Sequence, residues 1–343
     1  MNPTGDASGV LEEALERLHA AGPERLGRLT NHAPMVVEAL AAHGRSGAVH
    51  RWLDLYEAKL EEFPSPVEPV TDANWTAALG DPRRVADWIA YFTRAVGEGS
   101  WKGVLAEWWP RLLPGMYGGS THPVIRVGHA VRSLIEGGES APRLAELAHG
   151  LGYWAARHHP LPGIALLPGA HEAGEALAAL DAVAPIRDPH GGFPARLALV
   201  EQLPAWAGWV ADPDAARQRL AELVRAATHR YATHGHGNEI MLVHAATAPS
   251  AVLRTLPALP RTLWAPSLHA AWLASAAVTA MYAPSEPVPS VPPGRISAEE
   301  VLERALAHGD EHVIKLTDTA LDVGDEQALA AALRAIELGE PLA

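Results

Sequence analysis

Apolar residues recur at intervals of three and four along almost the whole chain, which is the spacing of one face of an α-helix. Alternation with period 2 is scarce, and no Asn-Gly or Asp-Gly pair separates two strand-like runs. The pattern predicts helices over residues 8–21, from 30–31 to about 43, and over 47–62, 72–78, 82–97, 100–112, 120–135, 141–157, 170–182, 193–208, 213–229 and 264–282, with an apolar stretch at 239–247 that ends before Pro249. We therefore predict an all-α protein.

Helix boundaries are marked by residues with known capping preferences. Thr30 and Asn31 are typical N-cap residues, as are Ser120 and Thr121 after a Gly-rich loop. Towards the C-terminus, the capping box that starts at Ser297 opens one predicted helix. Three further boundaries there are predicted at Gly309-Asp310, which ends one helix and caps the next, at Gly324, and at Asp325.

Two Pro-rich segments, 183–194 and 283–296, interrupt the helical pattern. Long irregular loops within a compact domain often act as lids, and candidate site residues lie on both sides of each segment. We therefore predict a single large multi-helix domain over residues 1–343 with these segments as lids, an N-terminal helix within 1–26 and a tail at 336–343.

Composition excludes several classes of protein. The 343 residues carry a net charge of −13, which argues against nucleic acid or an anionic membrane as the main partner. There is no cysteine, and therefore no disulfide, iron–sulfur cluster, Cys-ligated zinc site or Cys nucleophile. The first ten residues lack the basic and apolar regions of a signal peptide, and no apolar run is long enough to span a bilayer. We expect a soluble, cytoplasmic protein.

Lys315 is one of only three lysines among 27 basic residues, and it lies in the apolar run His312-Val313-Ile314-Lys315-Leu316. On a helix, His312 and Lys315 share one face. A buried lysine beside a histidine can have a lowered pKa and act as a base or nucleophile, or carbon dioxide can convert it into an anionic oxygen ligand for a metal. The alternative is a lysine whose apolar stem lies along the helix while its amine reaches water.

Four histidines have surroundings that suit ligands pointing inward, and they come from four predicted helices: His32, His122, His244 and His312. Taken alone, each is more typical of a cap or a hydrogen-bonded core histidine than of a ligand. Together with Lys315 they form a candidate metal site. His129 and Arg126 share a helix face with His122. His129 is a pocket residue or a core residue, and Arg126 holds an anionic substrate or forms a structural ion pair.

Other patterns are weaker. Glu16-x-x-His19 and Glu146-x-x-His149 have the spacing of di-iron bundles, but two further glutamate ligands are not evident. His234-Gly235-His236 resembles the His-x-His of metal-dependent hydrolases, but it lies in a predicted loop. The chain has no nucleotide-binding glycine motif after a strand.

The motifs Asn31-His32, Leu113-Pro114-Gly115 followed by His122-x-x-Ile125-Arg126, Val243-His244-Ala245-x-Thr247 and His312-Val313-Ile314-Lys315 occur in that order. In this arrangement the chain resembles the questin oxidase-like family over about residues 27–335. The family includes fungal enzymes that oxidatively open anthraquinone rings.

The resemblance implies a helical non-haem iron oxygenase. Carried over, the ligands of Fe(II) are His32, His122, His244 and His312, with Lys315 as a carboxylated lysine, and His129 is the reserve for the fourth histidine. From their positions on the predicted helices, we also predict Arg126, His129 and Lys315 as catalytic residues. The implied partners are dioxygen and a small aromatic polyketide, which is opened by C–C cleavage or a Baeyer–Villiger-type step. The resemblance also allows NADPH as a cofactor, although the sequence contains no binding motif for it.

Two other functions fit the same residues. A carboxylated lysine with histidines also serves zinc hydrolases, and a helical ligand-binding protein without catalysis needs no metal. Trp101, Trp108, Trp109, Tyr117 and Trp154 can stack on a flat substrate, or pack in the core.

Overall fold

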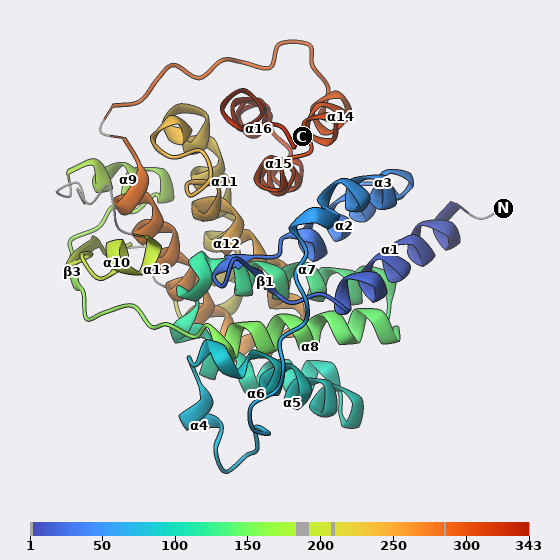
Figure 1. Cartoon of the computed structure of the whole chain (residues 1–343). Coiled ribbons are helices and arrows are strands. Elements are labelled where there is room, and N and C mark those ends of the chain that lie inside the picture. Colours follow the sequence, from blue (N-terminus) through green and yellow to red (C-terminus); the bar gives the residue numbers. More distant parts are fainter. Residues whose placement is uncertain (1–2, 183–191, 207–209, 285, 343) are drawn as a thin grey trace. The chain divides into compact units, whose positions relative to one another are not determined.

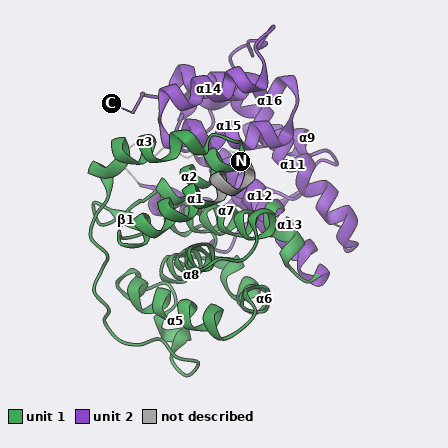
Figure 2. Ribbon diagram, turned by 90° about the vertical axis from the view of Figure 1, so that its right-hand side faces the viewer, with its two compact units in different colours: residues 1–160, 254–260 green, residues 161–253, 261–343 purple. Residues whose placement is uncertain are grey.

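The computed structural model describes residues 3–182, 192–206, 210–284 and 286–342. Most of these residues are helical, and the described strands form only two short two-stranded sheets, so the prediction of an all-α protein is confirmed. The chain forms two compact units (Figures 1 and 2). Unit 1 is Met1–Pro160 with Arg254–Pro260, and unit 2 is Leu161–Leu253 with Arg261–Ala343. The single-domain organisation stays a prediction.

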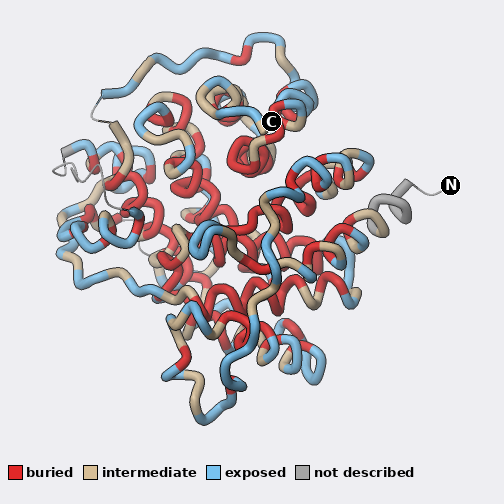
Figure 3. Tube along the Cα trace, viewed as in Figure 1, coloured by how far each residue is buried: buried red, intermediate tan, exposed pale blue. Residues whose placement is uncertain are grey.

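Unit 1 is built around the pairing of two long helices. It contains α1 (Pro3–His19), β1 (Glu24–Arg25), β2 (Leu29–Thr30), α2 (Ala33–Ala42), α3 (Ser46–Tyr56), α4 (Trp75–Ala78), α5 (Val85–Glu98), α6 (Trp101–Leu112), α7 (His122–Gly137) and α8 (Ala141–Ala156). Helix α8 packs against α5 on one side and α7 on the other, and α2 packs against α7. The core of this unit therefore surrounds α7 and α8, whose residues are mostly buried (Figure 3).

Unit 2 is also a helix assembly. It contains β3 (Ala165–Leu167), α9 (Ala173–Ala178), α10 (Phe193–Leu197), β4 (Gln202–Pro204), α11 (Pro213–His234), α12 (Val243–Thr255, which continues into the 254–260 segment), α13 (Trp264–Tyr282), α14 (Ala298–His308), α15 (Glu311–Val323) and α16 (Glu326–Leu338). Helix α11 packs against α13 and α16, and α15 packs against α14 and α16.

The predicted caps near the C-terminus are confirmed. The Ser297 hydroxyl accepts a hydrogen bond from the Glu300 backbone N–H, and the Asp310 carboxylate accepts bonds from the N–H groups of His312 and Val313. Gly309 and Gly324 end their helices in the left-handed conformation that favours glycine. The register of α15, which carries His312 and Lys315, is therefore set by local sequence.

Several boundaries differ from the sequence-based predictions, and helix α11, for example, continues five residues past its predicted end to His234. The N-terminal helix ends at His19, and strand β1 follows inside the range 1–26. The helix predicted over 47–62 ends at Tyr56, in a short 3₁₀ turn. The range 193–208 holds only the five-residue α10 and strand β4, because residues 202–204 pair in parallel with β3. The predicted tail begins inside α16, which continues to Leu338.

Helix α12 continues through Pro249 to Thr255, contrary to the predicted end. Proline lacks the N–H that would bond the carbonyl of Ala245 four residues earlier, which usually ends or kinks a helix. Here the hydroxyl of Ser275, on α13, donates to that carbonyl at 2.7 Å. A side chain from another helix therefore satisfies the group that proline leaves unpaired, and the helix persists.

The two Pro-rich segments differ in what the structure describes. Residues 183–191 of the first lie outside the described residues. Most of 283–296 has no regular structure and is largely exposed, and the Val288 N–H donates to the carbonyl of Thr233 near the end of α11. This segment is therefore an ordered loop attached to α11, and its function as a lid stays a prediction.

Candidate metal-binding residues in the two units

In unit 1, His32 and His122 face one another. Their Nε2 atoms are 2.7 Å apart and their ring centroids 4.5 Å, with the rings nearly perpendicular. Only 5% of the surface of His32 and 7% of that of His122 is exposed. Two ligands that sit at right angles around one metal at about 2.1 Å are roughly 3 Å apart, so this pair needs only a small adjustment to bind a metal together.

The ring of His122 is oriented by the backbone before it. Its Nδ1 lies 2.7 Å from the carbonyl oxygen of Gly119. A carbonyl can only accept, so Nδ1 carries the proton and Nε2 of the neutral ring carries the lone pair. Histidines that bind metals usually donate their other ring N–H in this way. The donor chemistry of His122 therefore fits a metal ligand.

The turn before His122 is strained. Gly119, Ser120 and Thr121 have φ values of 55°, 55° and 67°, and for residues other than glycine this conformation costs about 1–2 kcal/mol each. Thr121 occupies the predicted N-cap position, but its side chain makes no cap hydrogen bond. Such strain is concentrated at functional sites, where a particular geometry has to be held. Here the geometry holds the Gly119 carbonyl against the His122 ring.

The neighbouring side chains also position His32. It is the N-cap residue of α2, and its backbone N–H donates to the Tyr56 hydroxyl at 3.1 Å. The predicted cap, Asn31, lies one residue earlier. Its side chain accepts from the Ala33 N–H and donates to the carbonyl of Gly22. Asn31 therefore anchors the chain on both sides of His32.

His129 and Arg126 lie on α7, as predicted, and both bond to buried glutamates. His129 Nδ1 is 2.6 Å from Glu38 on α2, which also accepts from Arg132. Burial raises the pKa of Glu38, but the charges and hydrogen bonds of Arg132 and His129 outweigh it and lower that pKa to about 2. Glu38 therefore joins α2 to α7, the two helices that carry His32 and His122.

Arg126 forms the ion pair that the sequence left open as its alternative role. Its Nε and Nη2 donate to both oxygens of Glu146 at 2.6 and 2.8 Å, and His19 Nε2 lies 3.1 Å from the same carboxylate. Burial raises the pKa of Glu146, and Arg126 and His19 together lower it to about 2. The guanidinium beside Glu146 also argues against a di-iron site at Glu146 and His149, since it places a positive charge where a metal would bind.

In unit 2, His244 and His312 are neighbours, with ring centroids 5.5 Å apart and the rings nearly perpendicular. His244 is completely buried near the start of α12, and its Nδ1 lies 3.1 Å from the carbonyl of Met241. By the argument used for His122, Nε2 of His244 carries the lone pair. Both units therefore contain histidines with the proton arrangement of metal ligands.

Lys315 is almost completely buried, with 1% of its surface exposed, one turn after His312 on α15. Its Nζ has no hydrogen-bond partner among the described residues. Burial lowers the pKa of Lys315 to about 7, against the opposing charges of Glu311 and Asp310. The alternative of a lysine reaching solvent is therefore wrong, and a substantial fraction of the amine is neutral near pH 7.

The aromatic residues named from the sequence pack in the core of unit 1. Trp108 contacts Trp75, Trp88, Tyr91 and Phe92, and Trp109 meets Trp154 at a right angle. Sequence reasoning missed Glu38 and Glu146 as buried partners, because a glutamate within a helix is usually solvent-exposed. It also missed the left-handed turn at residues 119–121, for which Gly118-Gly119 was the available signal.

The fold and these buried histidines and lysine can now be set beside a comparison of the sequence with known families. The model of the questin oxidase-like family matches residues 29–319. The chain belongs to the questin oxidase-like family, and this membership indicates an oxidoreductase. No curated protein matches the chain. Among the described residues, no helix is long and apolar enough to cross a membrane.

Proposed function

We propose that the protein is a non-haem iron oxygenase that opens a ring of a phenolic or quinone-type aromatic polyketide. The observation that carries the proposal is the burial of Lys315, whose amine has no hydrogen-bond partner among the described residues. An uncompensated buried ammonium is costly, so a lysine kept in this position needs a reason. Membership of the questin oxidase-like family indicates an oxidoreductase, so we look for the role of Lys315 in that class of reaction.

Carboxylation resolves the cost of burying Lys315. The neutral Nζ attacks the carbon of carbon dioxide, an N–C bond forms and one proton leaves the nitrogen. The product is an anionic carbamate, whose oxygens are hard donors of the kind that Fe(II) accepts with imidazoles. A pKa of about 7 makes the nucleophilic neutral amine available at physiological pH.

In the proposed centre, His32, His122, His244, His312 and carboxylated Lys315 bind Fe(II). His122 and His244 are held by backbone carbonyls with Nε2 available, which supports their assignment. When bound, ferrous iron supplies the electron transfer needed to use dioxygen. The chain supplies the ligand geometry and apolar surroundings that exclude water. His129 and Arg126 are proposed to hold this arrangement through Glu38 and Glu146.

The reaction is proposed from the family alone: oxygen is inserted next to a carbonyl and a C–C bond of the ring is broken. Product analysis with labelled oxygen distinguishes the incorporation of one oxygen atom from that of two, and the consumption of NADPH during turnover tests whether it is the reductant.

The test is the metal content of protein purified with iron and bicarbonate, beside Lys315→Ala and His312→Ala. Stoichiometric iron in the wild type, lost in both variants, supports the proposal and leads to oxygen-uptake assays with hydroxylated anthraquinones. Zinc lost in both variants would favour a hydrolase instead. A wild type without metal would refute the centre and leave a ligand-binding protein.

A further inference from the structure

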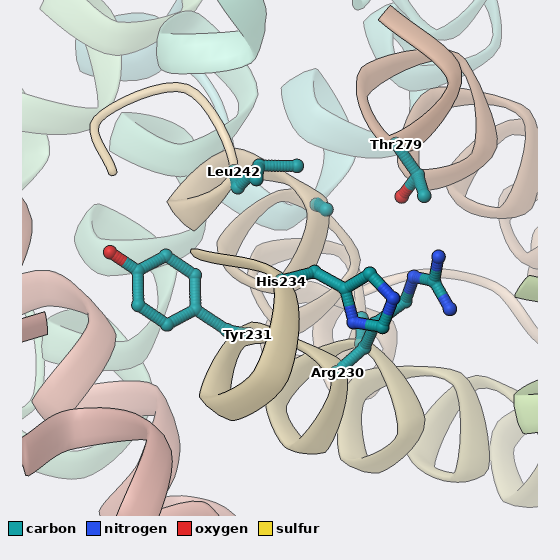
Figure 4. Close-up of a pocket in the computed structure, with 7 residues that line it drawn as sticks. Arg230, Tyr231, His234, Leu242 and Thr279 are labelled. Atoms are coloured by element: carbon teal, nitrogen blue, oxygen red, sulfur yellow. The ribbon is translucent and has the colours of Figure 1, made fainter. Parts of the chain in front are cut away.

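A small pocket in unit 2, between α11, α12 and α13, is too small for a substrate. Figure 4 shows the side chains of Arg230 and His234 next to each other in its lining. The space that the lining encloses has room for about one water molecule, which can hydrogen-bond to such polar side chains. The pocket therefore carries no ligand site.

In unit 1, the end of α8 lies against both chain segments that lead to the pair of His32 and His122. Tyr153 is in the last turn of α8 and is completely buried, and Arg157 is the C-cap residue of that helix. One segment is the hairpin of β1 and β2, which ends at Thr30, and the other is the Gly-rich turn before His122. One helix end therefore contacts the segments that precede both histidines.

Tyr153 and Arg157 each bond to one strand of the hairpin. The Tyr153 hydroxyl lies 2.8 Å from the Thr30 hydroxyl in β2, and both residues are buried. Arg157 donates from Nε and Nη2 to the two carboxylate oxygens of Glu24 in β1, at 2.6 and 2.5 Å. Glu24 and Thr30 are paired across the hairpin, so α8 holds the hairpin by both strands. His32 follows Thr30 by two residues, and its position depends on this attachment.

The same two residues of α8 lie against the Gly-rich turn. A Cβ atom at Gly118 would lie 1.5 Å from the carbonyl oxygen of Arg157, so only glycine permits this close approach. A Cβ atom at Gly119 would lie 3.1 Å from the Tyr153 hydroxyl, which is a tight contact. The Gly119 carbonyl accepts from the His122 ring. The Tyr153 hydroxyl therefore lies beside the residue that orients His122.

We propose that Tyr153 is a positioning residue for the His32–His122 pair, because its hydroxyl joins the segment before His32 to the segment before His122. Phenylalanine would fill the same space without the hydrogen bond to Thr30, and a buried hydroxyl that loses its partner is costly. The hairpin would then keep only its attachment through Arg157. The inference rests on the proposed function for the view that the pair binds a metal, whereas the distance between the two rings can be measured without one.

The test measures that distance in full-length, metal-free protein labelled with ¹⁵N-histidine. At 2.7 Å the two Nε2 atoms share a proton, and the hydrogen bond gives a scalar coupling between the two nitrogen nuclei by NMR. We expect the coupling in the wild type and its loss in Tyr153→Phe and Thr30→Val, which each remove one partner of the same hydrogen bond. Thr30→Ser keeps a hydroxyl and should keep the coupling. A substitution that only lowers stability would leave the coupling of the folded protein unchanged.

Tyr91→Phe is the matched control, since it removes a hydroxyl that bonds to Asp72 elsewhere in unit 1. It should keep the coupling of the wild type. A coupling that persists in Tyr153→Phe, or in Thr30→Val if the first variant does not fold, would overturn the positioning role. A wild type without the coupling would overturn it as well, because the two rings would then not be held together.

Titration with Co²⁺ connects the geometry of the pair to metal binding. Tyr153→Phe should bind Co²⁺ at least tenfold more weakly than the wild type and Tyr91→Phe, because residues that orient metal ligands typically affect affinity to this extent. A coupling that is lost in Tyr153→Phe in a protein that binds no metal would support the positioning role and refute the iron centre. Metal binding with a coupling that Tyr153→Phe leaves intact would do the reverse.

Discussion

The Nε2 atoms of His32 and His122 lie 2.7 Å apart, although 90 residues separate them in the chain. The His122 ring donates a hydrogen bond to the Gly119 carbonyl, and the His32 backbone N–H donates one to the Tyr56 hydroxyl; these bonds hold the two residues in this arrangement. Two buried imidazoles whose ring nitrogens face each other can form a hydrogen bond, transfer a proton or bind the same metal ion. The predictions below separate these uses and test the groups around them.

Removing either histidine should weaken metal binding. We expect His32→Ala and His122→Ala each to reduce metal affinity at least tenfold, because each substitution removes one ligand nitrogen that the remaining histidine cannot replace. Metal content measured by mass spectrometry after purification with iron and bicarbonate checks this. His50→Ala is the control, since His50 is on α3 with a half-exposed side chain paired with Glu13. Full metal content in both site variants would show that the pair serves only as a hydrogen bond.

Lys315 should be carboxylated in bicarbonate. With ¹³C-bicarbonate, the wild type should show the NMR signal of one carbamate carbon, because burial leaves much of the Lys315 amine neutral at pH 7. The signal should be absent in Lys315→Ala and unchanged in Lys102→Ala, a lysine that is exposed on α6. The same spectrum from all three proteins would show that the signal comes from another amine.

Stability of the metal-free protein should rise with pH between about 7 and 10.5. Unfolded Lys315 keeps its proton up to its ordinary pKa of 10.5, whereas the folded residue releases it near 7. The unfolded state therefore holds more protons across this window, which makes the free energy of unfolding increase with pH. The destabilisation of the folded state by protonated Lys315 is fully present below pH 7 and is on the order of 5 kcal/mol at most.

Urea unfolding in CO₂-free buffer at pH 6.5 and 9.5 measures this dependence. Lys315→Met should be more stable than the wild type at pH 6.5 and should lack most of the pH dependence, because it removes the buried charge and keeps the side-chain length. An equal slope in the two proteins would contradict the depressed pKa of Lys315.

The ion pair of Arg126 and Glu146 should act on stability. Arg126→Met leaves the buried Glu146 carboxylate without its guanidinium, with His19 remaining as a hydrogen-bond partner among the described residues, and breaking a buried pair costs about 3–5 kcal/mol. Replacing both residues, in Arg126→Met/Glu146→Leu, should recover much of that loss. Thermal unfolding of the three proteins tests this, and a stable Arg126→Met with impaired turnover would instead favour the substrate-holding role.

The same carboxylate should contribute to acid unfolding. Glu146 has an ordinary pKa of 4.5 when unfolded and about 2 when folded, so its stabilisation is complete above pH 4.5 and is lost as the pH falls towards 2. Glu146→Gln should flatten the decline of stability over that window. An unaltered acid slope would mean that other carboxylates dominate it.

Ser275 should matter only because Pro249 is a proline. Ser275→Ala leaves the buried carbonyl of Ala245 without the hydroxyl that donates to it, which should cost about 1–3 kcal/mol. In a Pro249→Ala background the new N–H can bond the same carbonyl, so the second substitution should cost much less. A double-mutant cycle by urea unfolding measures this coupling. Additive effects would indicate that the hydroxyl does not compensate for the proline.

Local sequence signals were sufficient for much of the fold. Period-3.6 patterning predicted most helices, and the caps at Ser297, Asp310 and Gly324 were confirmed because capping hydrogen bonds form within a few residues. The prediction failed at 193–208, where a parallel strand pair forms, and at Pro249, where a side chain from another helix intervenes. Both failures come from contacts between distant segments, which local patterns do not contain.

The sequence by itself determined the all-α class, the family, and the helix faces that carry His312 and Lys315, because these follow from residue order and helical spacing. Only the tertiary structure decided that Lys315 is buried, that His32 meets His122, and that Arg126 is paired with Glu146. It alone placed Tyr153 against both segments that lead to His32 and His122. Burial and pairing depend on which helices pack together, and they set the dielectric environment and the charge partners that determine a pKa or create a binding site.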